Sequence, residues 1–385
     1  MIARRPFLIQ LGRAAAAGVA TASAGRAWSA ATPGVSADAV TIGASVGLTG
    51  ATAVGGQGHV AGIRAAFDEI NRAGGIHGRM LRLDARDDAY DPKRSLQNVT
   101  AMVESGSVFA LMSMVGTGSN LATNPMTEAA GVPVVGPITG AESLRRADQR
   151  FTFHVRPSYY DEVAYMVTQF VQMGHRDLAV VFLDNAFGKE ILGYTKRAFA
   201  EAKVRALAEV SLAGDGKNAA DCADQVLRSK AGAVILATTG AANTDFVLAV
   251  RSRGSSLPMV GLSLTFNDGQ RLGKNTAGLA STLVFPPFKS DKYAIIRRFW
   301  ASMHAAKQTS QANSAIESWW NAQVLAQGLR RAGRDLTRER FRAGLVGMRD
   351  FGMDELLVSF PDKAPYVGMK QVSLGVFSPD GILRT

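Results

Sequence analysis

Cysteine is almost absent from this chain of 385 residues, which contains only Cys222. A single cysteine excludes an intramolecular disulfide, so the fold must be held together by packing alone. It also excludes the paired cysteines of a structural zinc site. The five histidines form no motif that would activate a thiol. We therefore interpret Cys222 as a small, buried apolar residue.

The signatures of common α/β enzymes are also missing. Residues 43–50 read Gly-Ala-Ser-Val-Gly-Leu-Thr-Gly, which does not fit the three-glycine spacing of a dinucleotide-binding turn. The sequence contains no Gly-Lys-Ser/Thr phosphate loop and no His-Glu-x-x-His zinc motif. We therefore predict a protein without catalytic residues, metal ligands or a cofactor.

Long hydrophobic runs are lacking as well, because no segment after the N-terminal region has 18 uninterrupted apolar residues. The N-terminal region itself carries Arg4 and Arg5 before Phe7-Leu8, followed by a weakly apolar, alanine-rich run. This pattern resembles a twin-arginine export signal, with small residues near positions 27–31 as the cleavage region. We predict that residues 1–31 are an export signal and that the protein is periplasmic. A general secretory signal is the alternative.

Acidic residues are fewer than basic ones, which gives a formal net charge of +11. The predicted signal holds four arginines and no acid, so its removal lowers the net charge from +11 to +7. The remaining basic residues are scattered over predicted helices instead of forming one patch, as a nucleic-acid site would require. We therefore expect a basic, solvated surface and no nucleic-acid partner.

Short apolar segments alternate with amphipathic segments along the rest of the chain. Residues 40–46 favour a strand, and Ile63, Phe67 and Ile70 then fall on one face of a helix that Gly74-Gly75 ends. Alternating strands and helices predict parallel sheets with right-handed crossovers. Further strands are predicted over residues 80–85, 108–115, 132–136, 178–183, 206–210, 233–237, 259–262, 356–360 and 372–377, and further helices from Asp91-Pro92 and over residues 125–130, 160–173, 189–202, 219–228, 244–253 and 312–332.

Two predicted strands end in turns rich in glycine and hydroxyl side chains. One turn spans residues 116–119 and the other spans residues 138–141. Backbone N–H groups at the start of a helix bind a carboxylate, and glycine lets a ligand approach the backbone closely. Ordinary loops with capping residues are the alternative. The residues that we expect to bind a carboxylate here are Gly116, Thr117, Ser119, Ile138, Thr139 and Gly140.

Several short motifs occur in a fixed order, and together they resemble the leucine/isoleucine/valine-binding protein family of type I periplasmic binding proteins. The similarity covers nearly the whole chain after the predicted signal. The motifs are Gly58-x-x-x-Gly62, Ile70-Asn71, Gly74-Gly75-Ile76-x-Gly78, Asp87-Asp88, Asp91-Pro92, Phe187-Gly188, Arg251-x-x-Gly254, Gly375-Val376-Phe377 and Asp380-Gly381.

The resemblance implies an α/β fold of two Rossmann-like lobes with parallel sheets, joined by three crossover strands near residues 153–157, 284–289 and 358–360. Lobe 1 would comprise residues 38–156 and 289–357, and lobe 2 residues 157–288 and 358–385. It further implies a monomer that carries a small carboxylate ligand in the cleft between the lobes and passes it to a membrane ABC permease. The ligand would be a branched-chain amino acid or a related organic or aromatic acid. A sensory receptor of the same fold, not coupled to import, is the alternative.

The resemblance also implies three ligand contacts in lobe 2, at Phe187, Thr239 and Ser263. In the family an acid at the position of Ser263 binds the ligand's ammonium group, and aromatics stand where Thr239 and Gly55 are found here. A buried ammonium without a carboxylate is poorly compensated. We therefore expect that the ligand need not be an amino acid, and that a keto, hydroxy or aromatic acid fits as well. The acids that could substitute for Ser263 are Asp184, Asp268 and Glu317.

Two further pairs of residues carry expectations. Tyr90 and Val115 occupy the positions of a disulfide found in leucine-type receptors, which is consistent with the single cysteine of this chain. Trp319 and Trp320 are adjacent on a predicted helix and point about 100° apart. We expect at most one of them in the core, with the other facing the cleft or solvent.

Overall fold

The structure is a computed structural model that describes residues 32–266, 269–310, 313–353 and 356–385. The predicted export signal, residues 1–31, lies outside the described residues. The first of two large sheets is parallel throughout and continues the alternation of strand and helix seen in the sequence. Its strands, in spatial order, are β13 (Tyr366–Val367), β5 (Thr152–His154), β4 (Val134–Val135), β3 (Ala110–Met112), β1 (Ala39–Val46) and β2 (Met80–Asp87).

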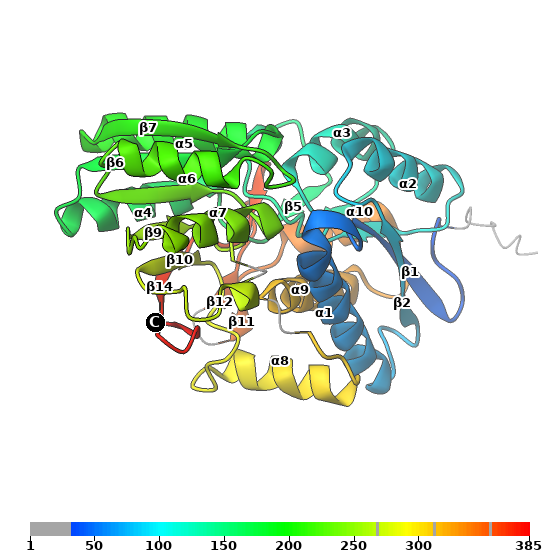
Figure 1. The fold of residues 1–385 in the computed structure, drawn as a ribbon. Helices are drawn as coiled ribbons and strands as arrows, with labels where there is room; N and C mark the ends of the chain where they lie inside the picture. The colour runs from blue at the N-terminus through cyan, green and yellow to red at the C-terminus, as the bar shows by residue number, and fades with distance from the viewer. Residues whose placement is uncertain (1–31, 267–268, 311–312, 354–355) are drawn as a thin grey trace, which may run out of the picture. The chain divides into compact units, whose positions relative to one another are not determined.

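Helices from both halves of the sequence pack against this sheet and make lobe 1 (Figure 1). Helix α1 lies along α9, although the two are far apart in the chain. Their apolar side chains share one core cluster with β1, β3, β5 and the hairpin of β11 (Phe351–Met353) and β12 (Leu356–Val358). The helices of lobe 1 are α1 (Ala53–Arg72), α2 (Pro92–Glu104), α3 (Thr117–Ala129), α8 (Ala294–Ala305), α9 (Ser314–Ala332) and α10 (Arg338–Val346).

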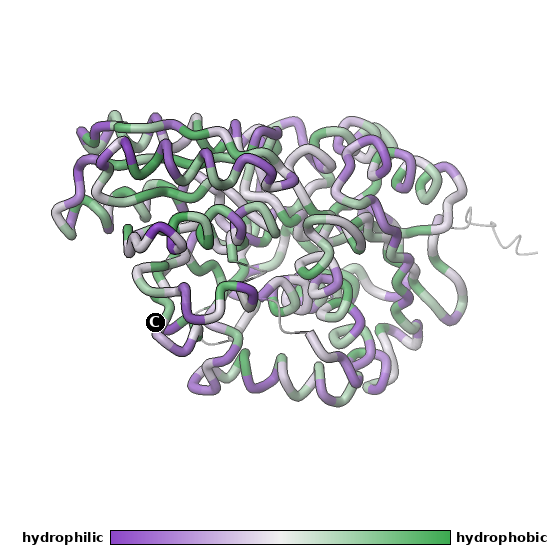
Figure 2. The backbone as a smooth tube through the Cα atoms, viewed as in Figure 1, coloured by the Kyte–Doolittle hydropathy of each residue, from purple (hydrophilic) through white to green (hydrophobic). Residues whose placement is uncertain are grey.

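The second sheet is mixed, because β14 runs antiparallel to both of its neighbours while the remaining strands are parallel. Its strands, in spatial order, are β15 (Leu383–Arg384), β14 (Ser373–Phe377), β10 (Leu279–Leu283), β9 (Met259–Gly261), β8 (Ala233–Ala237), β6 (Asp177–Leu183) and β7 (Arg205–Leu212). With α4 (Tyr159–Gln172), α5 (Ala186–Ala202), α6 (Ala219–Arg228) and α7 (Gly240–Ser252) it makes lobe 2. Figure 2 shows its central strands as hydrophobic stretches between helices of mixed polarity.

Local sequence explains where several helices begin. Asp91 accepts hydrogen bonds from the first N–H groups of α2, and Asn185 accepts one at the start of α5. Ser158 and Asp161 form a reciprocal capping box at the start of α4. Short 3-10 turns occur at η1 (Gly50–Thr52), η2 (Glu142–Leu144) and η3 (Gly269–Leu272). The caps of α2, α4 and α5 fix the helix ends that face the carboxyl edges of the two sheets.

The predicted class, an α/β fold of two lobes with parallel strands, is confirmed. The chain passes between the sheets after β5, after β10 and again between β13 and β14. This third passage covers residues 368–372, which is later than the expected 358–360. The reason is that residues 356–358 pair with β11, and Tyr366–Val367 then returns to lobe 1 beside β5.

Several elements were not predicted from the sequence. They are the short strands β11, β13 and β15, the strand β10, and the helices α8 and α10. The expectation for the tryptophan pair is wrong, because Trp319 and Trp320 are both fully buried. Helix α9 contacts α1, α8, α10 and β4, so it has neighbours all round and both rings enter the core. Among the described residues, no helix is long and apolar enough to cross a membrane.

Candidate ligand-binding cleft

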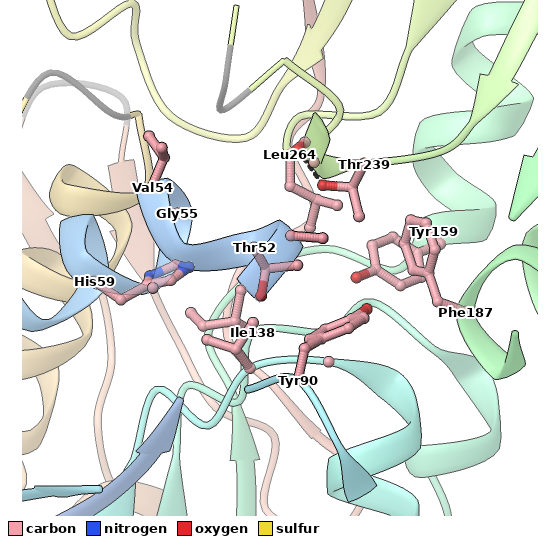
Figure 3. A pocket seen from close by; sticks show the side chains of 15 residues that line it. Thr52, Val54, Gly55, His59, Tyr90, Ile138, Tyr159, Phe187, Thr239 and Leu264 are labelled. Atoms are coloured by element: carbon pink, nitrogen blue, oxygen red, sulfur yellow. Dashed lines mark hydrogen bonds between the residues drawn. The ribbon is translucent and has the colours of Figure 1, made fainter. Parts of the chain in front are cut away.

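A cleft of about 530 Å³, counting space that is open to solvent, lies where helices from both lobes begin (Figure 3). Val54, Gly55 and Gly56 reach it from the first turn of α1, and Gly116 is the residue that precedes α3. Five lining residues come from lobe 2, and three of them, Tyr159, Phe187 and Gly240, stand at the starts of α4, α5 and α7. Within the described chain, five helices thus direct their N-terminal ends at one space. A helix N-terminus carries a partial positive charge that favours an anion, although side chains already bond N–H groups at the starts of α4 and α5.

None of the described residues that line the cleft is an aspartate, glutamate, lysine or arginine. The one titratable base is His59, which is buried and whose Nδ1 lies 2.7 Å from the hydroxyl of Ser318. Burial, followed by the charge of Arg156, lowers the pKa of His59 to about 3. His59 is therefore neutral at physiological pH, so no charged side chain lines the cleft in the described chain.

Aromatic and aliphatic side chains form most of the wall. Tyr159 packs edge-to-face on Phe187 with ring centroids 5.4 Å apart. Figure 3 shows the hydroxyls of Tyr90 and Tyr159 turned toward each other inside the cleft. Burial is the largest cause that raises the pKa of both phenols, for Tyr159 to about 12, so both are neutral O–H groups. The cleft therefore offers an apolar surface with a few hydroxyl groups.

Two threonines at the cleft differ in how their hydroxyls are satisfied. Thr239 donates a hydrogen bond to the carbonyl of Leu264, at 2.9 Å. The hydroxyl of Thr52 is buried and has no hydrogen-bond partner among the described residues. A buried hydroxyl without a partner costs free energy that a ligand atom could recover. Thr52 thus has a hydroxyl that could still donate and accept a hydrogen bond.

The nine residues expected from the sequence divide into three groups. Gly116, Ile138, Phe187 and Thr239 line the cleft. Thr117, Ser119, Thr139 and Gly140 are buried just behind it, and the hydroxyls of Thr117 and Thr139 bond to each other at 2.9 Å. Ser263 lines a second cavity that shares the walls His59 and Leu264 with the cleft.

Ser263 is bound by a charged network instead of standing alone at its strand end. Its hydroxyl accepts a hydrogen bond from Nη2 of Arg156 at 2.5 Å, and Arg156 also pairs with Glu162 and Glu317. Of the three substitute acids, Glu317 lines the second cavity. Asp184 is exposed and pairs with Lys189 at 2.8 Å, and Asp268 lies outside the described residues.

Sequence reasoning missed several residues of the cleft. Tyr90 was noted only as a replaced cysteine position, yet its ring lies against Gly116, where a Cβ atom would be 2.6 Å from Cε2. The sequence gave no indication that Thr52 and Tyr159 line the cleft. Thr52 precedes α1 and Tyr159 begins α4, and neither belongs to a motif. Tyr90 and Tyr159 are aromatic residues of the cleft wall, whereas Gly55 and Thr239 are not.

One serine of the described chain has the sequence spacing of a catalytic nucleophile. Gly43-x-Ser45-x-Gly47 has the spacing of a nucleophile elbow, but Ser45 is buried within β1. Its hydroxyl donates to Asp88 at 2.8 Å, and no histidine is paired with it in the described chain. The described residues also contain no cluster of histidine, cysteine and acids arranged to hold a metal ion.

Comparison with known proteins agrees with this reading of the fold. Residues 39–361 match the family described as periplasmic binding protein. The chain belongs to this family. This chain is 24% identical over 203 residues to Leu/Ile/Val-binding protein homolog 8 of Brucella abortus, and this match covers 50% of the chain and 49% of the relative. The chain thus spans about half the length of the curated relatives that it matches.

Solved structures resemble the periplasmic binding protein over most of its length. A substrate-binding periplasmic protein from Ralstonia solanacearum is 29% identical with a TM-score of 0.83, covering 90% of this chain and 99% of that one. A solute-binding protein of an ABC transporter from R. palustris, in complex with benzoate, is 18% identical with a TM-score of 0.80, covering 90% and 94%. The second likeness shows the fold alone. Both neighbours are described as binding proteins and neither as an enzyme.

Proposed function

We propose that this periplasmic binding protein holds a small carboxylate with an apolar body in the cleft and delivers it to the membrane permease of an ABC importer. The observation that carries the proposal is the convergence of five helix N-termini, among the described helices, on a space without charged side chains. Such a site attracts an anion through the backbone and leaves the walls free for apolar contact.

The residues of the walls suggest where the carboxylate and the apolar body of the ligand would each lie. The carboxylate would lie near Gly116 and the free hydroxyl of Thr52, where N–H groups and a donor are available. Its apolar body would lie between Tyr90, Ile138 and Phe187. Thr117, Ser119, Thr139 and Gly140 would support the turns from behind. Relatives named for leucine, isoleucine and valine, or solved with benzoate, have carboxylate ligands in common.

Export, transport and domain organisation complete the proposal. The paired arginines before residues 7–8 support export by the twin-arginine route, with residues 1–31 removed. The mature protein would act as a monomer in the periplasm, because the cleft is complete within one chain. We propose the division into lobe 1 and lobe 2 that the sequence predicts, with one change. The third passage between the lobes is at residues 368–372.

Mass spectrometry of small molecules that remain bound through gentle purification tests the proposal. We expect one or a few carboxylic acids to be released when the protein is denatured. Thr239→Trp would fill the cleft with an indole and should abolish this retention, whereas Thr168→Trp, at an exposed position of α4, should not. Retention of only amines or sugars, or equal retention by the Thr239→Trp variant, would contradict the proposal.

A further inference from the structure

A second cavity, of about 410 Å³ counting space that is open to solvent, adjoins the cleft and offers a carboxyl group, which the cleft lacks. The two spaces share His59 and Leu264 in their walls. Ser263 and Glu317 contribute a hydroxyl and a carboxyl to the second cavity. Ser263 and Glu317 therefore lie in a space next to the one in which we propose that the ligand binds.

Arg156 makes a shorter contact with Glu162 than with Glu317. Nη2 of Arg156 lies 2.7 Å from Oε1 of Glu162, and both side chains are fully buried. The other oxygen of Glu162 accepts from the N–H of Ser263 at 2.8 Å and from the hydroxyl of Thr282 at 2.5 Å. This carboxylate has three good donors, the arrangement that stabilises an ionised group.

Glu317 has a much poorer set of partners. Both of its oxygens approach a single nitrogen, Nη1 of Arg156, at 3.3 and 3.5 Å. Burial is the largest cause acting on this carboxyl and raises its pKa, the charge of Arg156 opposes the shift, and that of Glu162 adds to it. Across the cavity, His59 is neutral. Arg156, Glu162 and His59 are the charged and titratable groups that face Glu317 in the described structure, and one cation cannot fully balance two carboxylates.

Another polar side chain in the wall of this cavity is Ser263. Its oxygen accepts from Arg156, and its own O–H has no acceptor in the described structure. A hydroxyl that accepts from a guanidinium is polarised and becomes a better donor. An ammonium group placed here would instead lie close to the buried guanidinium of Arg156, which repels it.

We propose that Glu317 determines ligand specificity as a neutral carboxyl, which donates together with Ser263 to an acceptor oxygen of the ligand. The inference rests on the proposed function and narrows it. The ligand is a carboxylic acid with a second acceptor oxygen, such as a keto acid, and not an amino acid. Loss of the Glu317 proton turns a donor into an anion that repels the acceptor oxygen.

Titration calorimetry on ligand-stripped protein tests this with leucine and its keto acid. The wild-type protein should bind the keto acid more tightly, and its affinity should fall as the pH rises and Glu317 loses its proton. Glu317→Gln keeps a neutral donor, so it should retain the affinity and lose the pH dependence. Glu317→Ala removes the donor and should weaken binding about two- to tenfold.

Opposite results identify which statement fails. An ionised Glu317 that binds an amine would give tighter binding of leucine, affinity that rises with pH, and loss of binding in Glu317→Gln. Any of these overturns the inference and leaves the proposed carboxylate function intact. Binding of neither acid to the wild-type protein also overturns it, and stabilisation of the protein by other carboxylates would show that the proposed function survives. Thermal unfolding of each variant shows whether it is folded.

Discussion

Arg156 and Glu162 form a fully buried ion pair, with 2.7 Å between Nη2 and Oε1. Arg156 follows β5, where the chain leaves lobe 1, and Glu162 belongs to the first helix of lobe 2. The pair also fixes the strand end at Ser263 through the backbone N–H and the hydroxyl. The junction between the lobes is therefore anchored by charge as well as by packing.

Removing one partner of this pair should destabilise the protein strongly. Glu162→Gln would leave the guanidinium of Arg156 buried with a poorer counter-ion, and we expect the free energy of unfolding to fall by about 3–5 kcal/mol. Urea denaturation followed by circular dichroism measures this. Glu201→Gln, on the exposed face of α5, should change stability little. A loss no larger than that of the control would show that the pair does not hold the junction.

The stability of the protein should depend on the ionisation of Glu317. Its pKa is raised in the folded state, chiefly by burial, so its contribution to stability is present below the pKa of the unfolded chain and is lost as the pH rises through the folded pKa. We expect the wild-type protein to lose stability relative to Glu317→Gln as the pH rises. Melting temperatures of the two proteins, measured at a series of pH values, test this. If Glu317 is ionised and well paired, the difference between the two proteins should not grow as the pH rises.

Gly116 should be sensitive to even a methyl group. Its φ of +98° is in a region that other residues rarely adopt, and a Cβ atom would lie 2.6 Å from Cε2 of Tyr90. We expect Gly116→Ala to lower the free energy of unfolding by about 1–3 kcal/mol and to weaken ligand binding. Gly193→Ala, in α5 where a Cβ meets open space, should stabilise by about 0.5–1 kcal/mol. Equal effects of the two substitutions would refute the strain at Gly116.

The export route can be tested on its own. Changing Arg4 and Arg5 together to Lys should block export if the twin-arginine pathway is used, because that pathway is defined by the arginine pair. Immunoblots of periplasmic and cytoplasmic fractions measure this, and N-terminal sequencing should place the start of the mature chain between residues 25 and 32. Unchanged export of the double variant would point to the general secretory route.

The sequence predicted those elements whose signal is local. Strands β1, β6 and β8 and helix α6 were expected within a few residues of their bounds, and so was the start of α2, because apolar periodicity and capping residues mark them. The two-residue strands β13 and β15 exist only because a neighbouring strand offers its edge. Burial of both Trp319 and Trp320 likewise depends on four neighbours of α9 that no periodicity reveals.

The cleft was predictable in part for the same reason. Glycine-rich turns after strands identified Gly116 and Ile138 as cleft residues. Arg156 and Glu317 are separated by 161 positions in the sequence, and only the folded chain brings them together. Tyr90 and Tyr159 face each other for the same reason. Side chains that contribute function through tertiary contact carry no local pattern.

The most direct test of the central claim compares the melting temperature of the protein with small carboxylic acids and with their primary amides. The amide keeps the shape of the acid and removes its charge, so it tests the anion preference that five helix N-termini create. We expect at least one acid to stabilise the protein by about 2.7 kcal/mol at a hundredfold excess over its dissociation constant, and its amide to give no measurable shift. Equal stabilisation by acid and amide, or stabilisation by amines or sugars alone, would contradict the account.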